Sequence, residues 1–393
     1  RMKKAIVLGA AMLLAGAAVF AADASAKPAV KFSGSATAGY SFNFGSDNHV
    51  YSSWKDYDGD DYEGTLNLSV SDADGLWTAK FDQGVIDMGD ADIETAITVS
   101  LTKALGKAGI DTGDFGLSFT LGDQDWVTQL TAYGDKSGAH YQRNQAGNGG
   151  YNIVLDASYA SLLKLKLIAS PLDDEVNDTK KQSFGVSALV APVDGVKVAA
   201  DYSYNGRTRA YAYAYGDRST KVNPAGDEKA TFKNLFGVSA AVDVAKLIGA
   251  ENYKIGVDLA DRFSFGDEDD ATFGDNMYNR FSATVYGGID MVDGYAEYSL
   301  VSNDDDTKAY DNMHQLKVGA NLNLVKDLGL GLYTEFLDLS DEVDDCDAIT
   351  VGGDVSFSFG NVLYAVNLEY THDGARDTDD NVFAITPSLT VSF

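Results

Sequence analysis

Residues 381–393 read NVFAITPSLTVSF and alternate between two kinds of side chain. One parity is mostly large and apolar, and it carries Phe383, Ile385, Leu389, Val391 and Phe393. The other parity carries small residues, mostly Ser and Thr. Successive side chains of a β-strand point to opposite faces, so this stretch predicts a strand with one apolar face and one small polar face. The aromatic Phe393 falls in phase with the apolar face.

The same alternation recurs along the chain, for example in residues 30–44, 253–265, 316–324 and 349–359. Segments of about ten residues that alternate in this way are the signature of a transmembrane β-barrel. The polar parity is largely Ser, Thr, Gly and Asn, whereas the solvent face of a soluble β-sandwich would be rich in Lys and Glu. Aromatic residues crowd the strand ends, as in the interfacial girdles of barrels. The sequence therefore predicts an all-β, antiparallel, up-and-down transmembrane barrel.

The connections between these segments alternate between short and long, and most of the long ones are acidic. Barrels of this kind have short turns on one side and long loops on the other. We count 18 strands, starting near residues 30, 62, 75, 93, 115, 151, 162, 183, 195, 232, 252, 278, 294, 311, 328, 347, 361 and 381. The parity slips near residues 122–126, so residues 115–133 form either one bulged strand or a strand plus part of a loop. Sixteen strands is the alternative count.

The N-terminal residues have the pattern of a secretory signal. A basic start at residues 1–4 precedes an uncharged stretch and then small residues with an A-x-A site ending at Ala26. We expect residues 1–26 to be a cleaved signal peptide and residues 27–393 to form the barrel.

Together these features resemble the porin superfamily of bacteria with two membranes, over essentially the whole of residues 27–393. The resemblance implies export through the periplasm to the outer membrane, contact with outer-membrane lipid and a homotrimer. It also implies that the final strand is read by the barrel-assembly machinery, through Phe383, Leu389, Val391 and Phe393. The P-E-F-G-G motif that marks the inward loop in the best-known porins is absent from this sequence.

A barrel of this size encloses a water-filled lumen, and its inward side chains decide what passes. We therefore expect a porin that lets ions and small hydrophilic solutes diffuse passively. The alternative is a non-conducting surface protein, an adhesin or scaffold with cation-binding acidic loops. Strand parity gives these pore-lining candidates: Lys164, Lys166, Lys197, Asp201, Asp243, Lys254, Asp258, Arg262, Arg280, Glu297, Lys317, Glu335, Asp354 and Glu369.

In porins the loop after the fifth strand typically folds inward and narrows the pore. On our count this loop is residues 134–150, which are basic and rich in Gly, Asn and Gln. Its constriction candidates are Lys136, His140 and Arg143. Residues 206–230, rich in Arg and Tyr, are the other contender.

Other chemistry has little support in the sequence. No catalytic triad pattern, zinc-protease motif or phosphate loop is present, so we do not expect an enzyme or a cofactor. The net charge of −29 argues against a nucleic-acid partner. Asp56, Asp58 and Asp60 alternate as calcium ligands do, but their frame does not match an EF-hand loop, so loosely bound divalent cations are the most we expect there.

Overall fold

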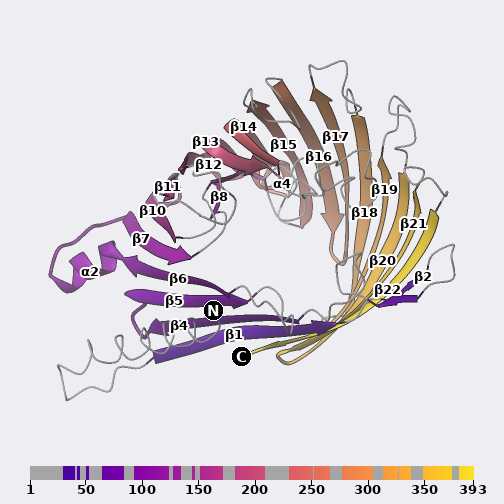
Figure 1. Cartoon of the computed structure of the whole chain (residues 1–393), viewed down its shortest axis with the longest axis horizontal. Coiled ribbons are helices and arrows are strands. Elements are labelled where there is room, and N and C mark those ends of the chain that lie inside the picture. Colours follow the sequence, from indigo (N-terminus) through magenta and orange to yellow (C-terminus); the bar gives the residue numbers. More distant parts are fainter. Residues whose placement is uncertain are drawn as a thin grey trace.

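The computed structural model describes residues 30–39, 42–44, 50–52, 64–83, 93–123, 127–133, 144–146, 151–170, 182–208, 230–250, 252–265, 277–303, 313–325, 327–337, 348–373 and 380–393. These residues build one closed antiparallel barrel of 18 strands. Figure 1 shows the strands following one another around the wall, with β1 running beside β22.

Two of the barrel strands are interrupted. The first consists of β1 (Val30–Gly39) and β2 (Phe42–Phe44), and the second of β3 (Val50–Ser52) and β4 (Gly64–Asp72). The next strands are β5 (Trp77–Gln83), β6 (Ile93–Ser100), β7 (Phe115–Asp123), β10 (Tyr151–Tyr159), β11 (Leu163–Ser170), β12 (Ser183–Val193), β13 (Val196–Thr208) and β14 (Ala230–Asp243). The wall continues with β15 (Tyr253–Phe265), β16 (Met277–Ile289), β17 (Val292–Asn303), β18 (Met313–Val325), β19 (Leu328–Leu337), β20 (Ala348–Phe359), β21 (Val362–Asp373) and β22 (Asp380–Ser392).

The barrel closes where β22 pairs with β1, in a register that runs from Ser35 opposite Ser392 to Gly39 opposite Ser388. Two further backbone hydrogen bonds extend this seam. Gly34 N donates to Phe393 O at 2.7 Å, and Phe393 N donates to Gly34 O at 2.9 Å. Closure removes the free edges that an open sheet would expose.

Short connections gather at one end of the barrel, the end at which β1 begins and β22 finishes. Most are tight turns, and Gly195 and Gly360 adopt positive φ angles of 89° and 62° there. Two connections carry one short helix each, α2 (Leu101–Lys107) and α4 (Val244–Leu247), which the sequence did not predict. No helix among the described residues has the length and apolar character needed to cross a membrane.

Helix α2 is held against the neighbouring turn by its two lysines. Lys107 Nζ lies 2.9 Å from Asp74 Oδ2, and Lys103 Nζ donates to Asp74 O at 2.8 Å. The hydrogen bond from Lys107 and its positive charge lower the pKa of the Asp74 carboxyl.

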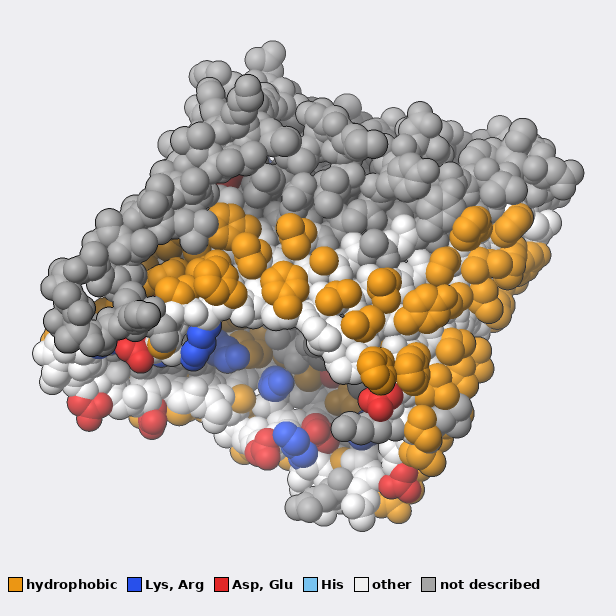
Figure 2. Space-filling model, turned by 90° about the horizontal axis from the view of Figure 1, so that it is seen from below, with side chains coloured by type: hydrophobic (Ala, Val, Ile, Leu, Met, Phe, Trp, Pro, Cys, Tyr) orange, Lys and Arg blue, Asp and Glu red, His pale blue; other side chains and the backbone are white. Residues whose placement is uncertain are grey.

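The two faces of the wall have the opposite polarity to those of a soluble protein. Large apolar side chains point outward and stay exposed, and Leu332 and Phe359 are 67% and 77% exposed. Figure 2 shows hydrophobic side chains gathered in a band across the face in view, with Lys and Arg side chains beside a hollow below it. The inner face carries small polar and charged residues, and such a barrel matches a bilayer outside and water inside.

The architecture confirms the all-β barrel and the count of 18 strands, and the alternative count of 16 is wrong. Residues 115–133 are a strand plus part of a loop: β7 ends at Asp123, and the chain then leaves the wall. The parity slip near residue 122 therefore marks the end of a strand. It does not mark a bulge.

We expect Gly34 to be required for tight closure. An added Cβ at Gly34 would clash with the backbone oxygen of Asn67 on β4 and lie 2.9 Å from Phe393 Cζ, so Gly34→Ala is expected to lower the stability of the barrel by about 1–3 kcal/mol through overpacking. The temperature at which the folded band shifts in a denaturing gel measures this effect. Gly287→Ala is the matched control, because its added Cβ would meet nothing nearer than Lys254 O at 3.7 Å. Equal unfolding temperatures for the two variants would contradict this account of the seam.

Candidate functional site

The chain that follows β7 folds into the barrel, and we call residues 127–133 the inner segment. It begins with the short strand β8 (Val127–Thr128), which pairs with β9 (Asn144–Ala146). Ala146 is fully buried against Val154 and Ile168, and Val127 packs on the same cluster. Since Val154 and Ile168 lie on the inner faces of β10 and β11, this apolar contact holds the entry of the inner segment against the inside of the wall. Figure 1 shows β8 within the curve of these strands.

Serine hydroxyls of the wall accept hydrogen bonds from backbone N–H groups of the inner segment. Leu130 N donates to Ser187 Oγ on β12 at 3.0 Å, and Ala132 N donates to Ser239 Oγ on β14 at 2.9 Å. A backbone N–H that leaves a sheet and is buried needs such an acceptor. The small inward serines therefore supply acceptors while leaving room for another chain to pass over them.

Two side-chain contacts add to this attachment. Lys166 Nζ on β11 donates to Thr128 O at 3.2 Å. Gln129 is 3% exposed, and its Nε2 donates to Ser203 Oγ on β13 at 3.1 Å. The inner segment thus crosses the wall from β11 to β14.

The far end of the inner segment rests on a buried ion pair. Tyr133 is 8% exposed and packs beside Ala260 of β15. The Arg262 guanidinium carbon lies 6.0 Å from the Tyr133 ring centroid, within reach of a cation–π contact. Arg262 Nη1 lies 3.0 Å from Asp201 Oδ2, with side chains 0% and 1% exposed.

Further around the wall, charged side chains of neighbouring strands join in one network. Arg280 Nη2 donates to Gln315 Oε1 at 2.9 Å, and Gln315 Nε2 in turn donates to Glu335. Lys317 Nζ lies 3.2 Å from the other Glu335 oxygen, Oε2. This network fixes charges of both signs on the inner faces of β16, β18 and β19.

The structure places every pore-lining candidate on the inner face, because residues opposite each other across paired strands share a face. They do not all meet water. Lys164, Lys197 and Lys254 are exposed, whereas the following candidates are buried: Asp201, Asp258, Arg262, Arg280 and Glu297. For these five, parity gave the face, and their burial depends on contacts with neighbouring strands. The part of these candidates in conduction stays a prediction.

Of the remaining residues singled out in the sequence, some lie outside the described part of the chain and others lie on β22. Lys136, His140 and Arg143 lie outside the described residues, as do Asp56, Asp58 and Asp60. Phe383, Leu389, Val391 and Phe393 share the outward face of β22 and its extension. Among the described residues no group of three or more His, Cys, Asp or Glu side chains is placed to hold a metal ion.

Sequence reasoning expected the loop after the fifth strand, residues 134–150, to fold inward, and the described residues 144–146 of that loop form β9 inside the wall. It missed the anchoring serines and the part that residues 127–133 take in the inward path. Ser187, Ser203 and Ser239 look like ordinary inward residues of a barrel strand, and only their distant partners distinguish them. The parity slip after β7 was the one available signal that the chain leaves the wall there.

Comparison with solved structures finds the same architecture in outer-membrane proteins. The chain is similar to OpdO of Pseudomonas aeruginosa, with a TM-score of 0.57, 9% identity, and coverage of 93% of this chain and 97% of that one. It is similar to the outer membrane protein OprD of the same organism, with a TM-score of 0.56, 11% identity, and coverage of 93% and 94%. OpdL of that organism gives a TM-score of 0.56 at 9% identity, covering 93% and 98%. At identities this low, the structural likeness establishes a shared fold and nothing more.

No protein-family model matches the sequence. No curated protein matches it either.

We expect the buried pair under Tyr133 to be a main support of the wall. Asp201→Asn keeps the shape of the side chain but removes the charge opposite Arg262, which should cost about 3–5 kcal/mol because the guanidinium stays buried. Thermal unfolding in detergent measures the loss. The control is Asp194→Asn, whose exposed pair with Lys246 at 3.4 Å should be worth less than about 1 kcal/mol. The interpretation fails if the two variants lose stability equally.

Proposed function

We propose that this chain is an outer-membrane porin, a water-filled channel through which ions and small hydrophilic solutes diffuse passively. The observation that carries the proposal is a closed barrel with a polar inner wall, narrowed by a segment that hydrogen-bonds across that wall. A segment held inside by serine hydroxyls restricts the lumen without filling it with an apolar core.

Two further features support an aqueous lumen. Lys164, Lys197 and Lys254 point inward and are exposed, and ammonium groups on a closed inner wall need water around them. The outer face is apolar over the height of the strands, which suits a bilayer. The likeness in fold to the outer membrane protein OprD agrees with this location.

The path to the membrane forms part of the same proposal. We expect residues 1–26 to direct export and to be removed. The outward apolar residues of β22 are the ones we expect the barrel-assembly machinery to recognise, and a homotrimer is the expected assembly. Loosely bound divalent cations at the acidic loops remain an additional expectation.

Single-channel recording in a planar bilayer tests the channel. We expect ohmic steps from the purified chain, and larger steps from the triple variant Ser187→Ala, Ser203→Ala and Ser239→Ala, because the inner segment then loses its acceptors on the wall. The matched control is Ser356→Ala, a serine on the inner face of β20. If no conductance steps are recorded, the non-conducting surface protein is favoured. If the triple variant gives steps of unchanged size, the inner segment lies outside the conduction path.

The exposed lysines should set part of the ion selectivity. We expect Lys164→Glu with Lys197→Glu to move the reversal potential toward cation preference, because both side chains are exposed on the inner face. The shift should be large at 0.1 M salt, where the screening length is about 10 Å, and small at 1 M, where it is about 3 Å. Lys103→Glu, outside the barrel wall on α2, should leave selectivity unchanged. A shift that ignores salt would argue against a water-filled lumen at these lysines.

A further inference from the structure

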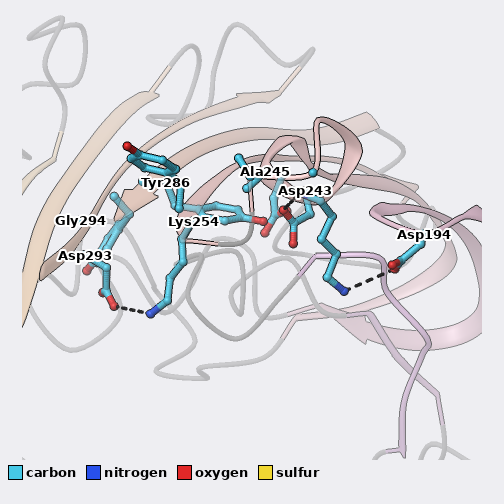
Figure 3. Close-up of a pocket in the computed structure, with 14 residues that line it drawn as sticks. Asp194, Asp243, Ala245, Lys254, Tyr286, Asp293 and Gly294 are labelled. Atoms are coloured by element: carbon cyan, nitrogen blue, oxygen red, sulfur yellow. Dashed lines mark hydrogen bonds and ion pairs between the residues drawn. The ribbon is translucent and has the colours of Figure 1, made fainter. Parts of the chain in front are cut away.

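A pocket of about 640 Å³ opens at the short-turn end of the barrel, away from the inner segment. Helix α4 and the turn at Asp194 form one side, and the first residues of β15 and β17 form the other. Figure 3 shows Lys254 reaching Asp293 at one end of the pocket, with Asp194 at the opposite end. This volume is within the usual range for small-molecule sites, about 300–1,000 Å³.

The charged groups that line the pocket are largely engaged with one another. Lys254 Nζ lies 3.3 Å from Asp293 Oδ2, and Asn321 Nδ2 donates to the other oxygen of Asp293 at 2.9 Å. Asp243 accepts a hydrogen bond from the backbone of α4 at 3.0 Å. These contacts hold carboxylate and ammonium groups in place, so each has a fixed direction for further hydrogen bonds.

Two tyrosines of the pocket lie against the wall on glycines. Tyr286 and Tyr295 face each other across β16 and β17. The Tyr286 ring covers Gly256 of β15, and the Tyr295 ring covers Gly319 of β18, where an added Cβ would lie 2.6 Å from Tyr295 Cε1. The two rings therefore turn away from each other, each lying close to the wall over a glycine. Both stay partly exposed, so part of each ring is open to the lumen.

A third tyrosine continues the same row. Gly319 is opposite Tyr333 of β19, whose ring covers Gly352 of β20. Tyr295 is the fourth residue of β17 and Tyr333 the sixth of β19, so the row rises from the pocket along the wall. Two strand spacings separate these two residues by about 10 Å.

Polar groups accompany the third ring as well. The Tyr333 hydroxyl donates to Glu369, and Lys317 Nζ lies 5.1 Å from the Tyr333 ring centroid. Each tyrosine of the row thus combines an apolar ring with nearby charged side chains that are held by neighbours.

We propose that the pocket and this tyrosine row bind carbohydrate, a linear oligosaccharide that enters at the short-turn end and lies along Tyr286, Tyr295 and Tyr333. A pyranose ring has an apolar face of C–H groups, which packs on an aromatic face, and a rim of hydroxyls, which bind carboxylates and ammonium groups. The pocket offers both. The proposal rests on the porin function, which it deepens by naming a solute class.

Charge favours a neutral polyhydroxylated solute over an organic cation. An ammonium ligand would need carboxylates free to face it, but Asp194 and Asp293 already face lysines and Asp243 caps α4. A cation there would have to share carboxylates that lysines and the backbone of α4 already hold. A sugar hydroxyl can bind the remaining hydrogen-bonding sites of the lysine or the carboxylate while the two stay paired.

The test is titration of maltotriose and cellotriose, with choline chloride as the cationic comparison, into the purified full chain in a planar bilayer and, independently, in detergent by calorimetry. We expect at least one trisaccharide to bind and to interrupt the current, and choline to do neither. Tyr286→Ala with Tyr295→Ala should weaken binding about fivefold or more, as expected for two lost aromatic contacts. Tyr286→Phe with Tyr295→Phe keeps the rings and should bind within about twofold of the unmodified chain.

Tyr364→Ala, on the outer face of β21, is the control for loss of a tyrosine and should bind as the unmodified chain does. Ion conductance without sugar reports on the porin function separately. A conducting channel that binds neither trisaccharide, or a double alanine variant that binds as tightly as the unmodified chain, overturns the carbohydrate site. Block by choline alone would overturn it in favour of a cation site. If no conductance is recorded, the porin proposal fails. Calorimetry then still tests the sugar site, by comparing trisaccharide binding to the unmodified chain, the double alanine variant and the double phenylalanine variant.

Discussion

The structure depends on the pairing of β22 with β1. In a bilayer no water is available for unpaired backbone groups, so a spanning sheet has to close on itself. The seam achieves this with five cross-strand pairs between β1 and β22, three between β2 and β22, and two further hydrogen bonds between Gly34 and Phe393. Once the sheet closes, every strand has an outside and an inside. The alternation of apolar and polar residues then becomes a division between lipid and lumen, and the inner polar wall follows from that division.

Inside the wall, the same need for backbone partners decides where the inner segment can lie. Ser187 and Ser239 offer hydroxyl acceptors to backbone N–H groups that have left the sheet. Beyond the inner segment, the Asp201–Arg262 pair is buried, whereas Lys164 and Lys254 are exposed. The lumen therefore has a packed region beside the inner segment and a more open one toward the short turns. The tyrosine row lies in that second region.

The sequence predicted the strands well, because a period of two is a local signal that each strand carries by itself. The same parity predicted that Arg262 and Glu297 lie on the inner face of the wall. Their burial did not, since it depends on groups brought together from distant strands. Asp201 and Arg262 are 61 positions apart. The path of the inner segment was missed for the same reason: Ala132 and Ser239 are 107 positions apart and belong to no shared motif. Helices α2 and α4 were missed because each is too short to show a helical period.

The central claim is that residues 127–133 run along the inner wall beside β12. A cysteine pair tests it most directly, in a background that carries Cys346→Ser. Leu130→Cys with Ser187→Cys puts one thiol on each of the two residues that meet where Leu130 N donates to Ser187 Oγ at 3.0 Å. The account predicts that mild oxidation links this pair within one chain in the membrane, seen as a reducible mobility shift, and that Leu130→Cys with Ser356→Cys on β20 does not link. A test pair that fails to link, or a control pair that links equally well, would contradict it.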